Sequence, residues 1–219
     1  MDKTVEFYYV RHGRTLFNEI GRMQGYCDSP LTEDGIRMAI EARDELKSIR
    51  FTKAYSSTSE RCVDTARIVL EGRDIPLYFH KGLKEMNFGL YEGIRIRNHQ
   101  EEIDERRFNT YDWSDVKGED RKALEKRVIR TYQEIFDEAV DGDKILIVSH
   151  GAIFLHMMEI LFGLDIKLYV KLIENDPAEY LPIPNGYAAD FIRCNDKYDI
   201  IKLQKRNDII LKTLKERKS

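Results

Sequence analysis

Hydrophobic and polar positions follow two different periods along this chain. Short apolar runs rich in β-branched and aromatic residues predict strands, and apolar positions spaced by roughly 3.6 residues predict helices between them. The predicted strands cover residues 5–10, 53–55, 75–79, 144–148, 188–194 and 198–203. The predicted helices follow Thr32, span 60–70, begin at Glu119, follow His150 and, in a charged form, end the chain. This alternation favours a three-layer α/β/α fold with a mostly parallel central sheet flanked by helices.

Capping and turn residues mark the ends of several predicted elements. Thr32 is a suitable N-cap for the helix whose apolar positions are Ile36, Ile40 and Leu46, with Ala39 beside them. Gly72 and Gly142 are expected to close the helices that precede them. These signals predict short connections and no long unstructured linker.

A single domain spanning residues 1–219 is the simplest organisation for this chain, because it shows no repeat or linker. Residues 94–118 are polar with dispersed aromatics and give no clear element, so we interpret them as an insertion on the substrate side. Arginines in this stretch are most often a solvated face; they are Arg95, Arg97, Arg106 and Arg107.

Charge and cysteine content narrow the function classes. The net charge is −3, so no broad basic surface indicates a nucleic-acid partner. No apolar run reaches the roughly 18 residues that would span a membrane. Three cysteines without a paired spacing indicate free thiols, and the charged N-terminus does not resemble a secretory signal, so a cytoplasmic location is expected. The oligomeric state stays open, with a homodimer among the options.

Polar side chains follow the predicted strands at the points where the strands end. Ligands of open α/β sheets bind beyond the carboxyl ends of the strands, so these side chains are expected to share one site. They are Arg11, His12, Ser56, Ser57, Glu85, Ser149 and His150, with Arg61 in the first turn of the helix after Ser57.

Two arginines, two histidines and a carboxyl group suit phosphoryl chemistry. The guanidinium groups of Arg11 and Arg61 stay charged and match phosphate oxygens. Nearby guanidinium groups lower the pKa of a histidine, and a neutral imidazole nitrogen can attack phosphorus. Transfer also needs an acid for the leaving oxygen, which a carboxyl group can supply.

Six motifs in order carry a resemblance to a known family. They lie between residues 8 and 187 and read VRHGRTLFN, GRMQGYCDSPLTEDG, SSTSERCVDTA, LKEMNFGLYEG, VSHG and PNGY. Together they resemble the histidine phosphatase superfamily and, within it, the phosphoglycerate-mutase-like branch.

The resemblance implies a role for each matching position. His12 would be the nucleophile that becomes phosphohistidine, and Glu85 would be the proton donor. Arg11, Arg61 and His150 would bind the phosphoryl group. Further contacts to phosphate or substrate would come from Asn18, Gln24, Gly25 and Gly151. No cofactor or metal is implied, and His156 is interpreted as a structural histidine of its helix.

Three functions remain open at this point. The first is a phosphatase that hydrolyses small phosphate monoesters, and the second is a phosphoglycerate mutase that uses the same phosphohistidine. The stretch after Gly93-Ile94 is shorter than in the large glycolytic mutases, which favours hydrolysis because a mutase must cover its intermediate. The third is a binding module without catalysis, against which the presence of both His12 and Glu85 argues.

Overall fold

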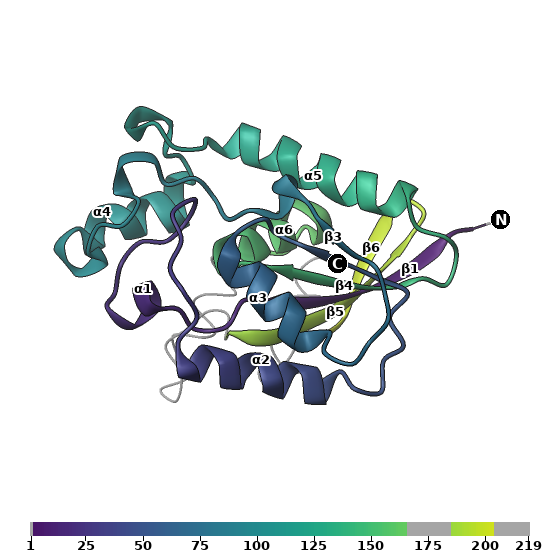
Figure 1. Ribbon diagram of the computed structural model, residues 1–219. Helices are drawn as coiled ribbons and strands as arrows, with labels where there is room; N and C mark the ends of the chain where they lie inside the picture. Colours follow the sequence, from purple (N-terminus) through teal and green to yellow (C-terminus); the bar gives the residue numbers. More distant parts are fainter. Residues whose placement is uncertain (1, 166–184, 204–219) are drawn as a thin grey trace.

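The computed structural model describes residues 2–165 and 185–203, where six strands form one sheet between two layers of helices (Figure 1). The strand order is β3-β2-β4-β1-β5-β6; the first four strands run parallel, and β5 and β6 are antiparallel to their neighbours. The predicted α/β class with a mostly parallel sheet is confirmed. The strands are β1 (Thr4–Arg11), β2 (Lys53–Ser56), β3 (Leu77–Phe79), β4 (Lys144–Ser149), β5 (Gly186–Cys194) and β6 (Lys197–Leu203).

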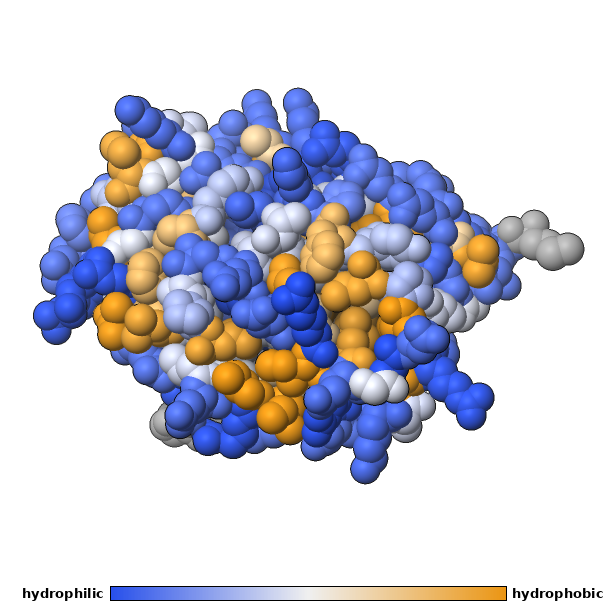
Figure 2. Space-filling view, viewed as in Figure 1, coloured by the Kyte–Doolittle hydropathy of each residue, from blue (hydrophilic) through white to orange (hydrophobic). Residues whose placement is uncertain are grey.

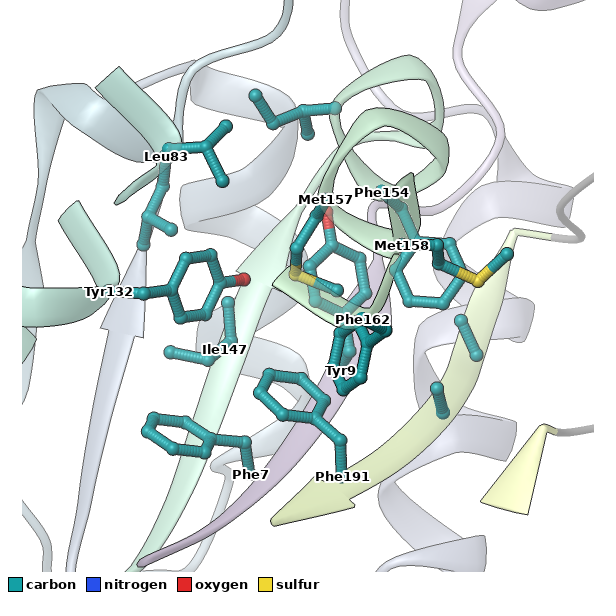
Figure 3. Close-up of a cluster of buried hydrophobic side chains, with 14 of the residues drawn as sticks. Phe7, Tyr9, Leu83, Tyr132, Ile147, Phe154, Met157, Met158, Phe162 and Phe191 are labelled. Atoms are coloured by element: carbon teal, nitrogen blue, oxygen red, sulfur yellow. The ribbon is translucent and has the colours of Figure 1, made fainter. Parts of the chain in front are cut away.

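The two sides of β1 belong to two hydrophobic cores, because successive side chains of a strand point to opposite faces. Phe7 and Tyr9 pack with residues of α5 (Arg121–Asp137) and α6 (Gly151–Phe162), and Figure 3 shows Phe7 beside Phe191 of β5. Tyr8 and Val10 join the second core, with residues of α2 (Glu33–Glu45) and α3 (Glu60–Val69). Burial on both faces explains why the central strands read as continuous apolar runs.

Two of the longer helices begin at a side-chain cap, and one of these caps, Thr32, was predicted from the sequence. Thr32 accepts a hydrogen bond from the Gly35 N–H (3.2 Å), and Asp120 accepts one from Ala123 N–H (2.8 Å), so α2 and α5 start at capped turns. The helices are α1 (Leu16–Glu19), α2 (Glu33–Glu45), α3 (Glu60–Val69), α4 (Gln100–Glu105), α5 (Arg121–Asp137) and α6 (Gly151–Phe162).

Several boundaries differ from the sequence-based expectation. The third strand begins at Leu77 instead of residue 75, since Pro76 has no N–H to donate to a sheet. Helix α5 ends at Asp137, and Gly142 lies in the turn before β4 with φ +80°. The stretch 94–118, for which no element was predicted, holds α4 followed by a π-helical turn at Arg106–Thr110. The charged C-terminal helix and Pro184 of PNGY lie outside the described residues.

Helix α2 buries only part of the face that its apolar spacing indicated. Gly35, Ala39, Ala42 and Leu46 are buried, whereas Ile36 and Ile40 are 43% and 36% exposed. Figure 2 shows hydrophobic side chains gathered over this helix on an otherwise mostly hydrophilic face. The small residues face inward because the backbone of Gly35 lies against Gly13. A Cβ added to Gly13 would lie only 2.2 Å from the Gly35 carbonyl oxygen.

Among the described residues, no helix is both long and apolar enough to cross a bilayer.

Candidate active site

Neighbouring strand ends bring the predicted site residues together at one edge of the sheet. Arg11 of β1 pairs in register with Ser149 of β4, and the next residue, His12, donates its backbone N–H to the Ser149 carbonyl (3.0 Å). Ser57, just after β2, donates its N–H to Val148 of β4 (2.9 Å). The polar ends of β1, β2 and β4 are therefore held next to one another by ladder hydrogen bonds.

The hydrogen bonds of His12 define which ring nitrogen is available for chemistry. Its Nδ1 lies 2.8 Å from the Gly13 carbonyl oxygen, which can only accept, so Nδ1 carries the proton. The lone pair is then on Nε2. Burial, followed by the guanidinium groups of Arg61 and Arg11, holds the pKa of His12 well below its usual value. The ring is therefore a neutral imidazole at physiological pH.

Arg11 supplies positive charge at the mouth of the same site. Burial lowers the pKa of Arg11 to about 10, so the guanidinium stays charged at neutral pH. Gly151 makes room for it, because a Cβ at this position would lie 3.0 Å from Cζ of Arg11. Gly151 of the VSHG motif thus packs directly against the guanidinium of Arg11 in the VRHGRTLFN motif.

Arg61 and His150 form a fully buried pair. Arg61 donates to the carbonyl oxygens of Gly25 (2.9 Å) and Cys27 (3.0 Å) and to the Asp28 carboxylate (2.8 Å), and its Nη2 lies 2.9 Å from Nδ1 of His150. Its Nε–H is also buried and has no acceptor among the described residues. Arg61 is therefore held from several sides by the loop at residues 25–28 and by His150.

The carboxylate of Glu85 is held by the first turn of α6. Its oxygens accept hydrogen bonds from the N–H groups of Met86 (2.9 Å), Ala152 (3.0 Å) and Ile153 (2.8 Å). The positive end of a helix suits a carboxylate, and three donors fix its orientation. The side chain is only 5% exposed, so Glu85 is held rigidly at the edge of the site.

A cavity of about 600 Å³ opens in front of these groups. Six of the nine predicted site residues line it, namely Arg11, His12, Asn18, Gln24, Glu85 and Gly151. Arg61, His150 and Gly25 are not among its lining residues. Gly25 packs instead against Met86, because a Cβ added to Gly25 would lie 2.3 Å from the Met86 carbonyl oxygen. The carbonyl oxygen of Gly25 accepts a hydrogen bond from Arg61.

Asn18 and Gln24 border the cavity while also serving the local fold. Asn18 completes a capping box with Thr15, whose N–H it accepts at 3.2 Å. Gln24 accepts a hydrogen bond from the Thr15 hydroxyl (2.6 Å) and donates one to Ser29 (3.0 Å). Both side chains thus border the cavity while making these local hydrogen bonds.

The described residues contain no cluster of three or more His, Cys, Asp or Glu side chains that could hold a metal ion.

A family model for the histidine phosphatase superfamily (branch 1) matches residues 7–214. The chain belongs to this superfamily.

Relatives within the superfamily carry two kinds of name. The chain is 32% identical to the adenosylcobalamin/alpha-ribazole phosphatase of Salmonella typhimurium, over 84% of this chain and 94% of the relative. It is 31% identical to a probable phosphoglycerate mutase, GpmB, of Yersinia pestis (strain Pestoides F), over 73% of this chain and 76% of the relative. The comparisons therefore include both phosphatases and mutases.

Solved structures give the same division. A phosphoglycerate mutase from Bacillus anthracis str. Sterne superposes with a TM-score of 0.77 at 25% identity, covering 100% of this chain and 98% of that one. A putative alpha-ribazole-5'-P phosphatase from Escherichia coli K-12 gives 0.73 at 25% identity, covering 92% and 97%. The fold is thus shared by members named for different reactions.

Arg107 and Glu92 lie close to the site but were not predicted from the sequence as site residues. Arg107 lines the cavity, although Arg95, Arg97, Arg106 and Arg107 were together interpreted as a mostly solvated face. Arg107 places Nη2 3.0 Å from the Met23 sulfur, and burial lowers its pKa. Its neighbour Arg106 pairs instead with Asp115 (2.7 Å) and is not among the residues that line the cavity. Successive residues of a helical turn point in different directions, about 100° apart in an α-helix. The sequence Arg106-Arg107 alone therefore does not indicate which of the two side chains lines the cavity.

Glu92 organises the loop that holds Arg61. Its carboxylate accepts hydrogen bonds from the N–H groups of Gly25 (3.0 Å), Tyr26 (2.8 Å), Cys27 (3.0 Å) and Phe88 (3.0 Å). Glu92 stands in the quoted motif LKEMNFGLYEG, which was the one signal that could have drawn attention to it.

Proposed function

We propose that this protein is a phosphatase that hydrolyses small-molecule phosphate monoesters through a phosphohistidine intermediate on His12, without a metal ion. One observation carries the proposal: a buried, neutral imidazole has its Nε2 lone pair exposed to a cavity while Arg11 and Arg61 lie close enough to lower its pKa. These arginines supply, at the same place, the positive charge that a phosphoryl group in transfer requires.

In the first step, the Nε2 lone pair of His12 attacks phosphorus and the bond from phosphorus to the alcohol oxygen breaks. The Nδ1–H keeps its hydrogen bond to the Gly13 carbonyl, so the positive charge that develops on the ring is stabilised there. Arg11, which lines the cavity, donates to phosphoryl oxygens, and the charge of Arg61 behind it adds to their stabilisation. Glu85, in its protonated form, gives its proton to the departing alcohol oxygen.

In the second step, water attacks phosphorus and the N–P bond breaks. Glu85, now a carboxylate, takes the proton from the water, and its fixed orientation against Ala152 and Ile153 keeps the acceptor oxygen in place. Inorganic phosphate leaves, and both His12 and Glu85 return to their starting forms. His150 supports both steps by holding Arg61 and by lying edge-on to His12, with ring centroids 5.3 Å apart.

A phosphoglycerate mutase is the second candidate, favoured by the probable mutase among the relatives. It would form the same intermediate, exclude water and return the phosphoryl group to a substrate hydroxyl. The short stretch at residues 94–118 and the relative named as a phosphatase, which aligns over 94% of its own length, support hydrolysis.

The test measures two reactions on one purified preparation. Phosphate release is followed with p-nitrophenyl phosphate and a panel of phosphate monoesters, and exchange between the two phosphoglycerate isomers is followed in parallel. Release that exceeds exchange supports the phosphatase, and exchange that exceeds release supports the mutase. Loss of both, in a protein that still binds phosphate esters, would favour the binding module instead.

A further inference from the structure

His156 of α6 lines the cavity, although the sequence indicates a structural histidine there. Its side chain is 6% exposed, close to the 4% of His12 and the 5% of Glu85. The ring contacts Tyr111 edge-on, with centroids 4.9 Å apart. No described residue forms a hydrogen bond with its nitrogens, and these are not among the enclosed side-chain atoms that lack a partner, such as Nε1 of Trp113. The nitrogens are therefore open to the cavity.

The packing of α6 does not require a polar side chain at this position. Every other buried side chain of this helix is apolar. Its remaining ionisable residue, Glu159, pairs with Arg121 (3.0 Å). A buried hydrogen-bonding group without a protein partner costs free energy unless water or a ligand supplies the partner. His156 thus keeps a hydrogen-bonding capacity that the fold itself does not use.

His156 lies one helical turn beyond the group that protonates the leaving oxygen. Ala152 donates its N–H to the Glu85 carboxylate (3.0 Å), and both Ala152 and His156 line the cavity. Residues four apart lie on one face of a helix, separated by about 6 Å along its axis. The ester oxygen must lie beside Glu85, so a short carbon chain attached to that oxygen can reach His156.

The imidazole of His156 is an uncharged hydrogen-bonding group. Burial, followed by the charges of Arg121 and Arg127, lowers the pKa of His156 to about 4, so the ring is neutral at physiological pH. A neutral imidazole donates through one ring nitrogen and accepts through the other. A hydroxyl group matches both nitrogens because it donates and accepts, whereas a carboxylate only accepts.

Anionic parts of a ligand have other partners in the same cavity. Arg11 lies at the phosphoryl end, against Gly151. Arg107, whose one hydrogen bond within the described residues goes to the Met23 sulfur, also lines the cavity. A charged guanidinium binds a carboxylate or phosphate group better than a neutral imidazole does. A second anionic group would therefore bind to Arg107, which leaves His156 for an uncharged polar group.

From these observations we infer that His156 is a specificity-determining residue, which forms a hydrogen bond with a hydroxyl group on the alcohol part of the phosphate ester. The alcohol that is released is then a diol or polyol. The inference rests on the proposed function and adds to it the class of ester and the residue that selects it.

Pairs of esters that differ in one group measure this contact. The hydroxylated esters are 2-hydroxyethyl, 3-hydroxypropyl and 4-hydroxybutyl phosphate, and their partners are propyl, butyl and pentyl phosphate, in which a methyl group replaces the hydroxyl. We expect the ratio of kcat/KM, hydroxyl over methyl, to be at least about fivefold higher in the wild type than in His156→Phe for at least one chain length. A smaller difference at every chain length would overturn the inference.

Two further variants separate the hydrogen bond from a change in packing. His156→Gln retains a donor and an acceptor, so its ratio should exceed that of His156→Phe at the same chain length. His99→Phe is the matched control and should keep the wild-type ratio, because His99 is exposed and does not line the cavity. If circular dichroism shows that His156→Phe does not fold, His156→Leu takes its place. Equal ratios in His156→Gln and His156→Phe would contradict a role for the hydrogen bond.

An ester with a carboxylate tests the anionic alternative. A wild-type preference for 2-carboxyethyl phosphate over 3-hydroxypropyl phosphate that is lost in His156→Phe would assign an anionic group to His156 and overturn the inference. The same preference retained in His156→Phe would place the carboxylate at Arg107, in agreement with the inference.

A binding measurement keeps the inference separate from the proposed function. Calorimetry compares the three pairs as phosphonates, in which a CH₂ group replaces the ester oxygen and prevents hydrolysis. The affinity ratio, hydroxyl over methyl, should be at least about fivefold higher in the wild type than in His156→Phe for at least one pair. If no ester is hydrolysed but this difference is found, the proposed function fails and the inference holds. A smaller difference for all three pairs overturns the inference even in an active enzyme.

Discussion

Nη2 of Arg61 lies 2.9 Å from Nδ1 of His150, and this contact sets the protonation of the imidazole. A guanidinium can only donate, so Nδ1 accepts and Nε2 carries the ring proton. That proton is donated to the Ser57 hydroxyl, 2.8 Å away. Burial and the charge of Arg61 also hold the pKa of His150 well below its usual value. Arg61 thus controls both the tautomer and the charge of a second histidine beside His12.

Arg61→Lys should therefore damage activity and stability together. A lysine cannot reach Gly25, Asp28 and His150 at once, because it lacks the planar fork. We expect kcat to fall about 100-fold and the free energy of unfolding to fall by about 3 kcal/mol. Steady-state kinetics and urea unfolding would measure the two effects. Arg67→Lys, on the exposed side of the same helix, should match the wild type in both assays.

Replacing the nucleophile gives the most direct test of the phosphohistidine. His12→Ala should bring phosphate release below detection and leave the circular dichroism spectrum unchanged, since the backbone contacts of His12 with Ser149 and Asn185 do not involve its ring. His80→Ala, which removes a histidine bonded to Glu134 outside the cavity, should retain activity. Phosphatase activity in a pure His12→Ala preparation would contradict the mechanism.

The acid role of Glu85 predicts a dependence on the leaving group. Glu85→Gln keeps the shape of the side chain but supplies no ionisable proton. The loss in kcat/KM should be about 1000-fold for alkyl phosphates, whose alkoxides need protonation, and about tenfold for p-nitrophenyl phosphate. A panel of esters graded by leaving-group pKa measures this slope. An equal loss for all of the esters would instead mean that Glu85 only anchors α6.

The hydrogen bonds of Glu92 predict that this residue positions the loop that holds Arg61. One carboxylate oxygen of Glu92 accepts from the N–H groups of Gly25 and Cys27, and the other accepts from those of Tyr26 and Phe88. In Glu92→Gln an amide NH₂ group replaces one of these oxygens, so one pair of N–H groups loses its acceptor. We expect a loss of about 3 kcal/mol in stability and a fall in kcat, because the Gly25 carbonyl that holds Arg61 shifts. Glu92→Asp, which restores the charge, should recover part of the kcat. A kcat equal to that of the wild type in folded Glu92→Gln would show that the loop does not position Arg61.

Much of this arrangement could be predicted because the sequence encodes it locally. The runs at β1 and β4 are apolar on both faces, and their ends carry Arg11, His12 and His150, so parallel pairing alone brings these residues together. The cap at Thr32 could also be identified from its own few residues.

Other features depend on contacts between distant segments and could not be predicted. Ile36 and Ile40 indicated a helix correctly, yet they lie outward because Gly35 must pack on Gly13. Arg107 lines the cavity and Arg106 pairs with Asp115, and this difference depends on how their helical turn is oriented. Arg61 and His150 were expected to bind the phosphoryl group, and the sequence could not show that they also form a bonded pair outside the lining of the cavity. Each of these outcomes is decided by packing between segments, which no local pattern records.

The buried histidines predict how stability depends on pH. His156 has a pKa of about 4 in the folded protein and about 6.5 when unfolded, so the unfolded chain binds more protons between these values. The stabilisation is complete above pH 6.5 and is lost as pH falls toward 4. His12 and His150, whose pKa values are also lowered, add to this loss in the same direction.

Thermal unfolding across this range would isolate the contribution of His156. In His156→Phe the ring contact with Tyr111 is preserved and no proton is taken up, so Tm should fall less between pH 7 and pH 4.5 than in the wild type. His99→Phe is the control, because His99 is exposed and does not line the cavity, and the Tm of this variant should follow the wild-type curve. A His156→Phe curve parallel to the wild type would mean that His156 takes up its proton without unfolding the protein, through water that enters the cavity it lines.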